Sequence, residues 1–181
     1  MTNSVTSQRA STLWIMVLTL ASTATTLAFA CATPFPALAA LTAVHMRQRD
    51  GVALAIAAWV ASQAVGFGFL GYPHDLGTML VGAAIGVAAV AGAIAAHATA
   101  ARMTAPLAAR LAAAYLAGFA AFKLVILAFT LAKGDPCTAF TAEVLGRQLL
   151  RNAAIMAGLL ALYRALVAIG VPAARPPMAA A

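Results

Sequence analysis

Eight polar or aromatic residues lie inside or beside long apolar segments, where such side chains could bind a ligand. They are Trp59, Gln63, Tyr72, His74, Asp75, Lys123, Arg151 and Asn152. Polar and ionisable groups within a membrane are energetically costly, so they point to a functional role by default. Together they offer hydrogen bonds and charge for recognising a small polar solute. We therefore expect them to form one ligand-binding pocket that opens to the outer face.

Each of these residues also has a structural explanation. Lys123 can extend towards the membrane surface or pair with Glu143 or Asp75. Gln63 and Asn152 can join helices through hydrogen bonds, and Arg151 can lie at the lipid head groups. For any one residue the structural role is the simpler explanation. For the set as a whole, a shared pocket is favoured.

Metal binding and catalysis find little support in the motifs. His74 and Asp75 are one His and one Asp, which do not complete a metal site, so we expect no metal and no other cofactor. Asp75 is instead a suitable N-cap for the helix that follows it. The chain lacks a Walker A loop, HExxH, GxSxG and a CxxC pair. We expect no enzymatic activity, and a membrane enzyme acting at the outer face is the weakest of three hypotheses.

Cys31 and Cys137 are the only two cysteines. We expect both at the outer face, where a periplasmic or extracellular environment permits disulfides. A bridge would join the first outer loop to the third. Two free thiols fit the sequence equally well.

The composition is that of a membrane protein. Of the 181 residues, 64% are hydrophobic and 8% are charged, and the mean hydropathy is +0.97. Soluble domains average about a quarter charged residues. A water-soluble surface cannot be built from so few charges, so we expect one integral membrane domain over residues 1–181 whose partner is the lipid bilayer.

The net charge of +7 does not indicate nucleic-acid binding. A nucleic-acid interface needs basic residues clustered on one face, whereas here they stand singly between apolar runs. Short cytoplasmic loops retain Lys and Arg, which explains the excess. We expect no nucleic-acid partner.

Apolar segments separated by short polar or Pro/Gly breaks predict an all-α fold, a polytopic bundle of six transmembrane helices. The predicted helices lie near residues 12–31, 35–46, 51–70, 77–99, 107–132 and 147–170, followed by a flexible tail at 172–181. The second is short. Pro34 and Pro36 permit either a turn between the first two helices or one long kinked helix over 12–46.

The distribution of basic residues favours six spans over five. With six spans, one side of the membrane carries Arg9, Arg47, Arg49, Arg102, Arg110, Arg164 and Arg175, and the other has Lys133, Arg147 and Arg151. The positive-inside rule then places both termini in the cytoplasm, with the chain in the cytoplasmic (inner) membrane. Residues 1–30 also resemble a signal peptide, but their apolar stretch exceeds the usual length of about 7–15 residues. We expect a retained first helix.

Small residues recur every four positions in several helices, for example at Gly82 and Gly86 and at Ala53 and Ala57. Such faces allow helix backbones to approach closely in lipid. In so alanine-rich a chain we expect them to serve packing within the bundle. A docking face for a partner subunit is the alternative.

The chain resembles the S-components of energy-coupling factor (ECF) transporters, small six-helix membrane proteins that capture vitamins or other micronutrients. The resemblance rests on size, helix number and three stretches: TPFPALAALTA at 33–43, RQRDG at 47–51 and QAVGFGF at 63–69. It implies a solute site near the outer face beneath the outer loops. It also implies docking through Ala-rich faces onto a coupling subunit that works with two ATPases.

The leading hypothesis is therefore a membrane-embedded substrate-binding and transport protein that captures a small polar, vitamin-like solute. The alternative is a non-catalytic accessory subunit of a larger membrane complex. The residues do not identify the solute.

Overall fold

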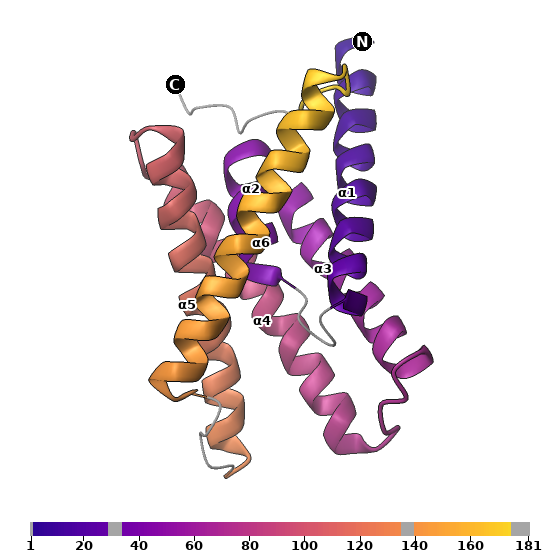
Figure 1. The fold of residues 1–181 in the computed structure, drawn as a ribbon, viewed down its shortest axis with the longest axis vertical. Helices are drawn as coiled ribbons and strands as arrows, with labels where there is room; N and C mark the ends of the chain where they lie inside the picture. Colours follow the sequence, from indigo (N-terminus) through magenta and orange to yellow (C-terminus); the bar gives the residue numbers. More distant parts are fainter. Residues whose placement is uncertain (1, 29–33, 135–139, 175–181) are drawn as a thin grey trace.

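The computed structural model describes residues 2–28, 34–134 and 140–174, with the backbone alone for 2–9 and 25–28. These residues form six α-helices and no strand (Figure 1). The helices are α1 (Thr2–Ala28), α2 (Phe35–His45), α3 (Gln48–Gly68), α4 (Leu76–Ala101), α5 (Leu107–Ala132) and α6 (Ala142–Ala168). The predicted all-α bundle is confirmed.

Helix positions agree with the sequence prediction except at two N-termini. α1 begins at Thr2 rather than near residue 12, and α6 begins at Ala142 rather than near residue 147. The α6 start is fixed by Thr141, whose hydroxyl accepts a hydrogen bond from the Val144 N–H at 3.4 Å. Polar first turns hide such starts from a hydropathy reading, because both helices extend beyond their apolar segments.

α1 ends at Ala28 and α2 begins at Phe35 after the non-helical Pro34, which favours two helices over one kinked helix across 12–46. Pro36 lies in the first turn of α2, where its missing N–H costs no helical hydrogen bond. The helix ends at His45, the next residue Met46 is extended (φ −132°, ψ 166°), and α3 follows after Arg47. Residues 29–33, between α1 and α2, lie outside the described part of the chain.

α2 is the central helix. It packs against α3, α4 and α5 and also against α6, and every residue from Pro34 to Val44 is buried. At 1.5 Å per residue its length is about 16 Å, roughly half the thickness of a bilayer's hydrocarbon core. A helix this short fills the centre of the bundle over only part of its height.

The bundle has two unequal halves. α1 begins and α6 ends at one end, and α2 lies in that half, here called the terminal half (Figure 1). The buried residues of α5 are Leu111, Ala114, Tyr115 and Gly118, all in its first half, and those of α6 are Leu159 and Tyr163. The remaining described stretch of these two helices, residues 119–134 and 140–158, is here called the α5–α6 region; its residues 149–158 lie at or beyond the level of Tyr115, towards the terminal end. None of its residues is buried.

Four helices, α3 to α6, are long and apolar enough to cross a membrane. The apolar part of α1, Ala10–Ala24, and the whole of α2 are shorter. The chain is therefore a multi-pass membrane helix bundle. The second predicted span is a short helix enclosed by protein on its sides, so it has no need to match the bilayer thickness.

Small residues make the closest contacts between helices. A Cβ atom at Gly92 of α4 would lie 3.0 Å from the Gly118 carbonyl oxygen of α5, so the two backbones touch. Gly82 and Gly86 of α4 accommodate side chains from α3. The small-residue face of α4 thus serves packing within the bundle, as predicted, whereas Ala53 of α3 is exposed.

The residues that follow α6 pack onto the bundle. The Trp14 indole N–H donates to the Pro172 carbonyl oxygen at 2.8 Å, and Ala174 is buried. The segment predicted to be a flexible tail from residue 172 therefore begins with three residues held against α1. A hydropathy pattern cannot show this contact, because it depends on one indole 158 positions away in the sequence. Residues 175–181 lie outside the described part.

Candidate solute-binding site

Trp59 and Gln63 lie on the face of α3 that contacts α4. The Trp59 indole N–H donates to the Gly82 carbonyl oxygen at 2.8 Å, and its ring lies over Gly86. The Gln63 side chain covers Gly82, and its amide is 3.4 Å from the Ser62 hydroxyl. Both predicted site residues therefore contribute to helix packing, which is the structural alternative for Gln63.

Tyr72, His74 and Asp75 lie in the connection between α3 and α4. The Tyr72 ring covers Gly66, and the rings of Tyr72 and His74 lie 5.9 Å and 5.3 Å from that of Phe67. This small aromatic group closes the end of α3 against the connection. His74 itself is exposed.

Asp75 is the N-cap of α4, as predicted. Its carboxylate accepts hydrogen bonds from the Thr78 N–H and the Thr78 hydroxyl, each at 2.9 Å. These bonds favour the charged form and hold the pKa of Asp75 below its usual value. The carboxylate is thereby committed to starting the helix.

Lys123 has a different environment. It is half-buried on α5, and its Nζ lies 5.8 Å from the centre of the Phe119 ring and 5.5 Å from that of Phe140. No ion pair joins it to Glu143 or to another acid in the described residues, whose ion pair is Arg49–Asp50 in the terminal half. The ammonium is flanked by aromatic rings and lacks a described counter-charge.

Asn152 is a second polar residue whose side chain could accept a further hydrogen bond. Its Nδ2 donates to the Gln148 carbonyl oxygen at 2.9 Å, while its Oδ1 is buried without a hydrogen-bond partner. Buried polar atoms are nearly always paired, so an orphan oxygen is unusual. Arg151 beside it is exposed.

One hydrogen bond between α5 and α6 relates the levels of these residues along the bundle. The Tyr115 hydroxyl donates to the Leu149 carbonyl oxygen, which puts these two residues at one level. At 1.5 Å per residue, Lys123 lies about 12 Å along α5 towards the opposite end, and Asn152 about 4 Å along α6 towards the terminal end. The structure thus distributes the predicted site residues over three places: the α3–α4 contact, the α3–α4 connection and the α5–α6 region.

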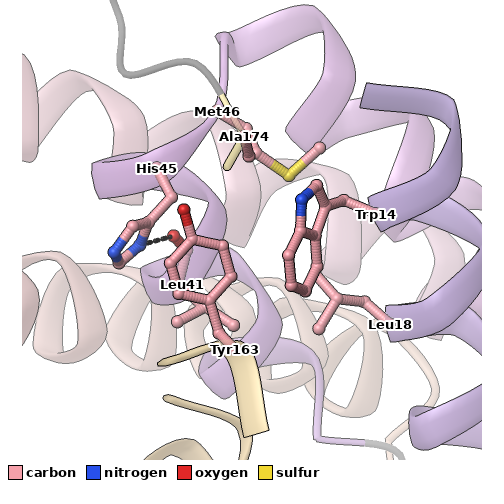
Figure 2. Close-up of a pocket in the computed structure, with 7 residues that line it drawn as sticks. All are labelled: Trp14, Leu18, Leu41, His45, Met46, Tyr163 and Ala174. Carbon is pink, nitrogen blue, oxygen red and sulfur yellow. Dashed lines mark hydrogen bonds between the residues drawn. The ribbon is translucent and has the colours of Figure 1, made fainter. Parts of the chain in front are cut away.

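A cavity lies in the terminal half, away from these residues. Figure 2 shows its lining: Trp14, Leu18, Leu41, His45, Met46, Tyr163 and Ala174. The Tyr163 ring lies 4.5 Å from that of Trp14 and 4.4 Å from that of His45. The cavity volume of about 10 Å³ is the least that holds one water, whereas ligand pockets measure about 300–1,000 Å³. This cavity is too small for a solute.

His97 is a buried residue whose position the sequence did not reveal. Its Nδ1 lies 2.9 Å from the Ala93 carbonyl oxygen, and its Nε2 has no hydrogen-bond partner. The ring packs against Gly51 at the start of α3, where a Cβ atom would lie 2.8 Å from Nε2. His97 thus belongs to the packed core of the terminal half.

No family model, curated protein or solved structure matches this chain. The similarity to S-components stays a prediction, and the candidate site rests on geometry. Within residues 2–28, 34–134 and 140–174, no three His, Cys, Asp or Glu side chains could hold a metal ion. Cys31 and Cys137 lie outside these ranges, so the proposed bridge also stays a prediction.

The strongest candidate site is therefore the group formed by Lys123, Phe119 and Phe140, here called the Lys123 site. Two of its three members escaped the sequence prediction. Phe119 precedes Lys123 by four positions, a spacing that places both on one helix face and could have indicated the pair. Phe140 comes from the segment before α6, and only the packing of that segment reveals it.

Proposed function

We propose that this chain is a solute-binding subunit that captures a small polar micronutrient from the outer face of the cytoplasmic membrane, in the manner of ECF S-components. One observation carries the proposal. Residues 34–44, the start and body of the central helix α2, are all buried, whereas the α5–α6 region has no buried residue and holds Lys123 between two aromatic rings. Polar groups in a membrane protein are expected to face the bundle interior or a water-filled cavity. A solute could reach a polar group that faces such a cavity.

The distribution of charge supports this orientation. Arg47, Arg49, Arg102 and Arg164 lie at the ends of helices in the terminal half. The positive-inside rule favours a cytoplasmic location for that end, with both chain ends inside and six membrane crossings. The Lys123 site then lies in the outer half of the bundle.

Native mass spectrometry of the protein purified in mild detergent tests the proposal. We expect a retained molecule of small mass, lost when Lys123→Met or Asn152→Ala is introduced. Leu124→Ala is the matched control on α5, because Leu124 is 64% exposed and outside the Lys123 site. A wild-type protein that retains no small molecule, and is not stabilised against heat by any of a panel of water-soluble vitamins, would overturn the proposal.

A second function, an accessory subunit, is favoured by the exposure of α6. Only Leu159 and Tyr163 of this helix are buried, and a Cβ atom at Gly146 or Gly158 would meet no atom within 4 Å. Small exposed residues permit close packing of another membrane helix. The expected result is co-purification with a coupling subunit and its ATPases, lost on Gly158→Leu. Retention of a solute by the isolated chain would favour the first function.

A further inference from the structure

Lys123 lies deep enough to need a counter-charge. It is nine residues from the end of α5 at Ala132, about 14 Å at the helical rise of 1.5 Å per residue. A charged side chain within the hydrocarbon region of a helix costs several kcal/mol unless it is paired or reaches water. Lys123 is half-buried and packs beside Phe119 and Phe140, so its neighbours must favour the ammonium.

The aromatic rings supply only part of that compensation. Cation–π contacts contribute about 0.5–1 kcal/mol at exposed sites and about 2 kcal/mol when desolvated. The Nζ–centroid distances of 5.8 and 5.5 Å are near the 6 Å limit of useful contact, so each ring contributes weakly. A full negative charge at the ammonium would stabilise it more than both rings.

The acids of the described chain are used elsewhere or exposed. Asp50 accepts a hydrogen bond from Ser11 at 2.7 Å and pairs with Arg49 at 3.4 Å, in the terminal half. Asp75 caps α4, and Glu143 is exposed. No carboxylate of residues 2–28, 34–134 or 140–174 lies within ion-pair distance of Lys123. Within the described residues, the Lys123 site therefore lacks the negative charge that a ligand could bring.

We propose that the solute is an anion, and that Lys123 binds its carboxylate or phosphate group while Phe119 and Phe140 contact its apolar part. This inference rests on the proposed function and names its substrate class. A lipid phosphate offers the same chemistry. Head groups lie at the membrane surface, however, and the position of Lys123 about 14 Å from the end of α5 favours a solute that enters the bundle.

The chain provides its own control for a test, because Lys123 and Lys133 are its only lysines. Lys133 also lies beside an aromatic ring, with its Nζ 5.6 Å from the centre of Phe129, but at the exposed end of α5. An amine-acetylating reagent therefore reports on two lysines of similar chemistry in one sample. Peptide mass spectrometry measures the acetylation rate of each.

The experiment compares the full-length protein in detergent with sodium phosphate and with sodium chloride at equal ionic strength. We expect phosphate to slow acetylation of Lys123 at least fivefold and that of Lys133 less than twofold. Equal rates for Lys123 in the two salts would overturn the anion proposal. A bound neutral solute in native mass spectrometry, lost in Asn152→Ala but kept in Lys123→Met, would overturn it while leaving the proposed function intact.

Further arms separate the remaining sources of negative charge. In nanodiscs without phosphate, slower acetylation of Lys123 in phosphatidylglycerol than in phosphatidylcholine would assign the anion to lipid and overturn the solute. Faster acetylation of Lys123 in the Asp135→Asn variant would show that the chain itself supplies the negative charge, and would overturn the solute. We expect neither effect. We also expect Lys123→Arg, which retains the charge, to keep the co-purified solute that Lys123→Met loses.

Discussion

The α2 segment and the α5–α6 region differ in how they use apolar and polar residues. Every residue from Pro34 to Val44 is buried, whereas no residue of 119–134 or 140–158 is. In the terminal half the Trp14 indole and the Nδ1 atoms of His45 and His97 all lie within hydrogen-bond distance of backbone carbonyls. In the α5–α6 region, Lys123 has no described counter-charge. Buried atoms without a hydrogen-bond partner occur in both regions, at the Asn152 Oδ1 and at the His97 Nε2.

The difference teaches that the short helix α2 packs closely over the part of α5 and α6 that it reaches and leaves the α5–α6 region partly exposed. α2 has eleven residues, so it reaches only part of the way along its neighbours. Where it lies, stability depends on side-chain volume and close backbone contact. Beyond it, the side chains of α5 and α6 are partly exposed, whereas α3 and α4 still bury Val65, Gly66 and Gly82. Four predictions test this contrast, in order of decreasing effect.

The largest expected effect is the loss of stability when a buried side chain of α2 is shortened. Leu41→Ala removes a fully buried side chain of α2 and should lower the free energy of unfolding by about 2–5 kcal/mol, through lost burial and a cavity. Leu124→Ala on α5, 64% exposed, should change it by less than about 0.5 kcal/mol. Unfolding in detergent by SDS titration measures both. Similar losses for the two variants would break the contrast.

The second effect concerns glycine. Gly51→Ala places a methyl group against the His97 ring in the terminal half and should destabilise the protein by about 1–3 kcal/mol. His97→Ala in the same chain should relieve the clash. The free energy of unfolding should therefore fall by less in the double variant than the sum of the two single losses.

The matched control for Gly51→Ala is Gly146→Ala in the α5–α6 region, where an added methyl group meets no atom within 4 Å. This change should stabilise α6 by about 0.5–1 kcal/mol, because alanine loses less backbone entropy than glycine. Destabilisation by Gly146→Ala would show that the region is packed more closely than its exposure indicates.

The fold was largely predictable from sequence, and the reason lies in the apolar segments. Hydropathy and proline placed α2 to α5 within a few residues, and Pro34 and Pro36 marked the break before α2. The same pattern could not show that α2 is enclosed by four helices, because length and composition do not reveal neighbours. The starts of α1 and α6 were missed for a different reason: their first turns are polar and lie outside the apolar segments.

The site was less predictable than the fold. The sequence identified Lys123 and Asn152 as costly polar residues, and the structure leaves both with unused capacity. The sequence prediction also placed Trp59 and Gln63 in the same pocket. In the structure these two polar side chains pack against Gly86 and Gly82 of α4. Depth along a helix can be counted from sequence, whereas the direction of a side chain depends on the tilt and neighbours of its helix.

The third prediction concerns the contact between α1 and the end of the chain. Trp14→Phe keeps the aromatic contact with Tyr163 but removes the N–H that donates to the Pro172 carbonyl. The expected loss is about 0.5–1.5 kcal/mol of unfolding free energy, typical of one hydrogen bond. Limited proteolysis should cut after residue 170 faster in this variant than in wild type. Unchanged cleavage would show that the indole does not hold this segment.

The smallest effect is at the start of α4. The Thr78 hydrogen bonds lower the pKa of Asp75, so the charged cap stabilises the helix above the unfolded pKa and is lost as the pH falls through the folded one. Amide exchange at Thr78 should therefore be less protected in acid than at neutral pH. Asp75→Asn, which caps without titrating, should remove this pH dependence. An unchanged acid response in that variant would assign it to another group.

The central claim is that α5 is buried where it lies beside α2 and accessible beyond it. The most direct test compares cysteines introduced at one position of each kind. Lys123→Cys and Ala114→Cys are introduced separately into α5 of a chain carrying Cys31→Ser and Cys137→Ser. Intact cells are then treated with a membrane-impermeant maleimide. We predict modification at position 123, which is half-buried in the α5–α6 region, and none at position 114, which is fully buried beside α2. Modification at 114, or none at either position, would contradict the account.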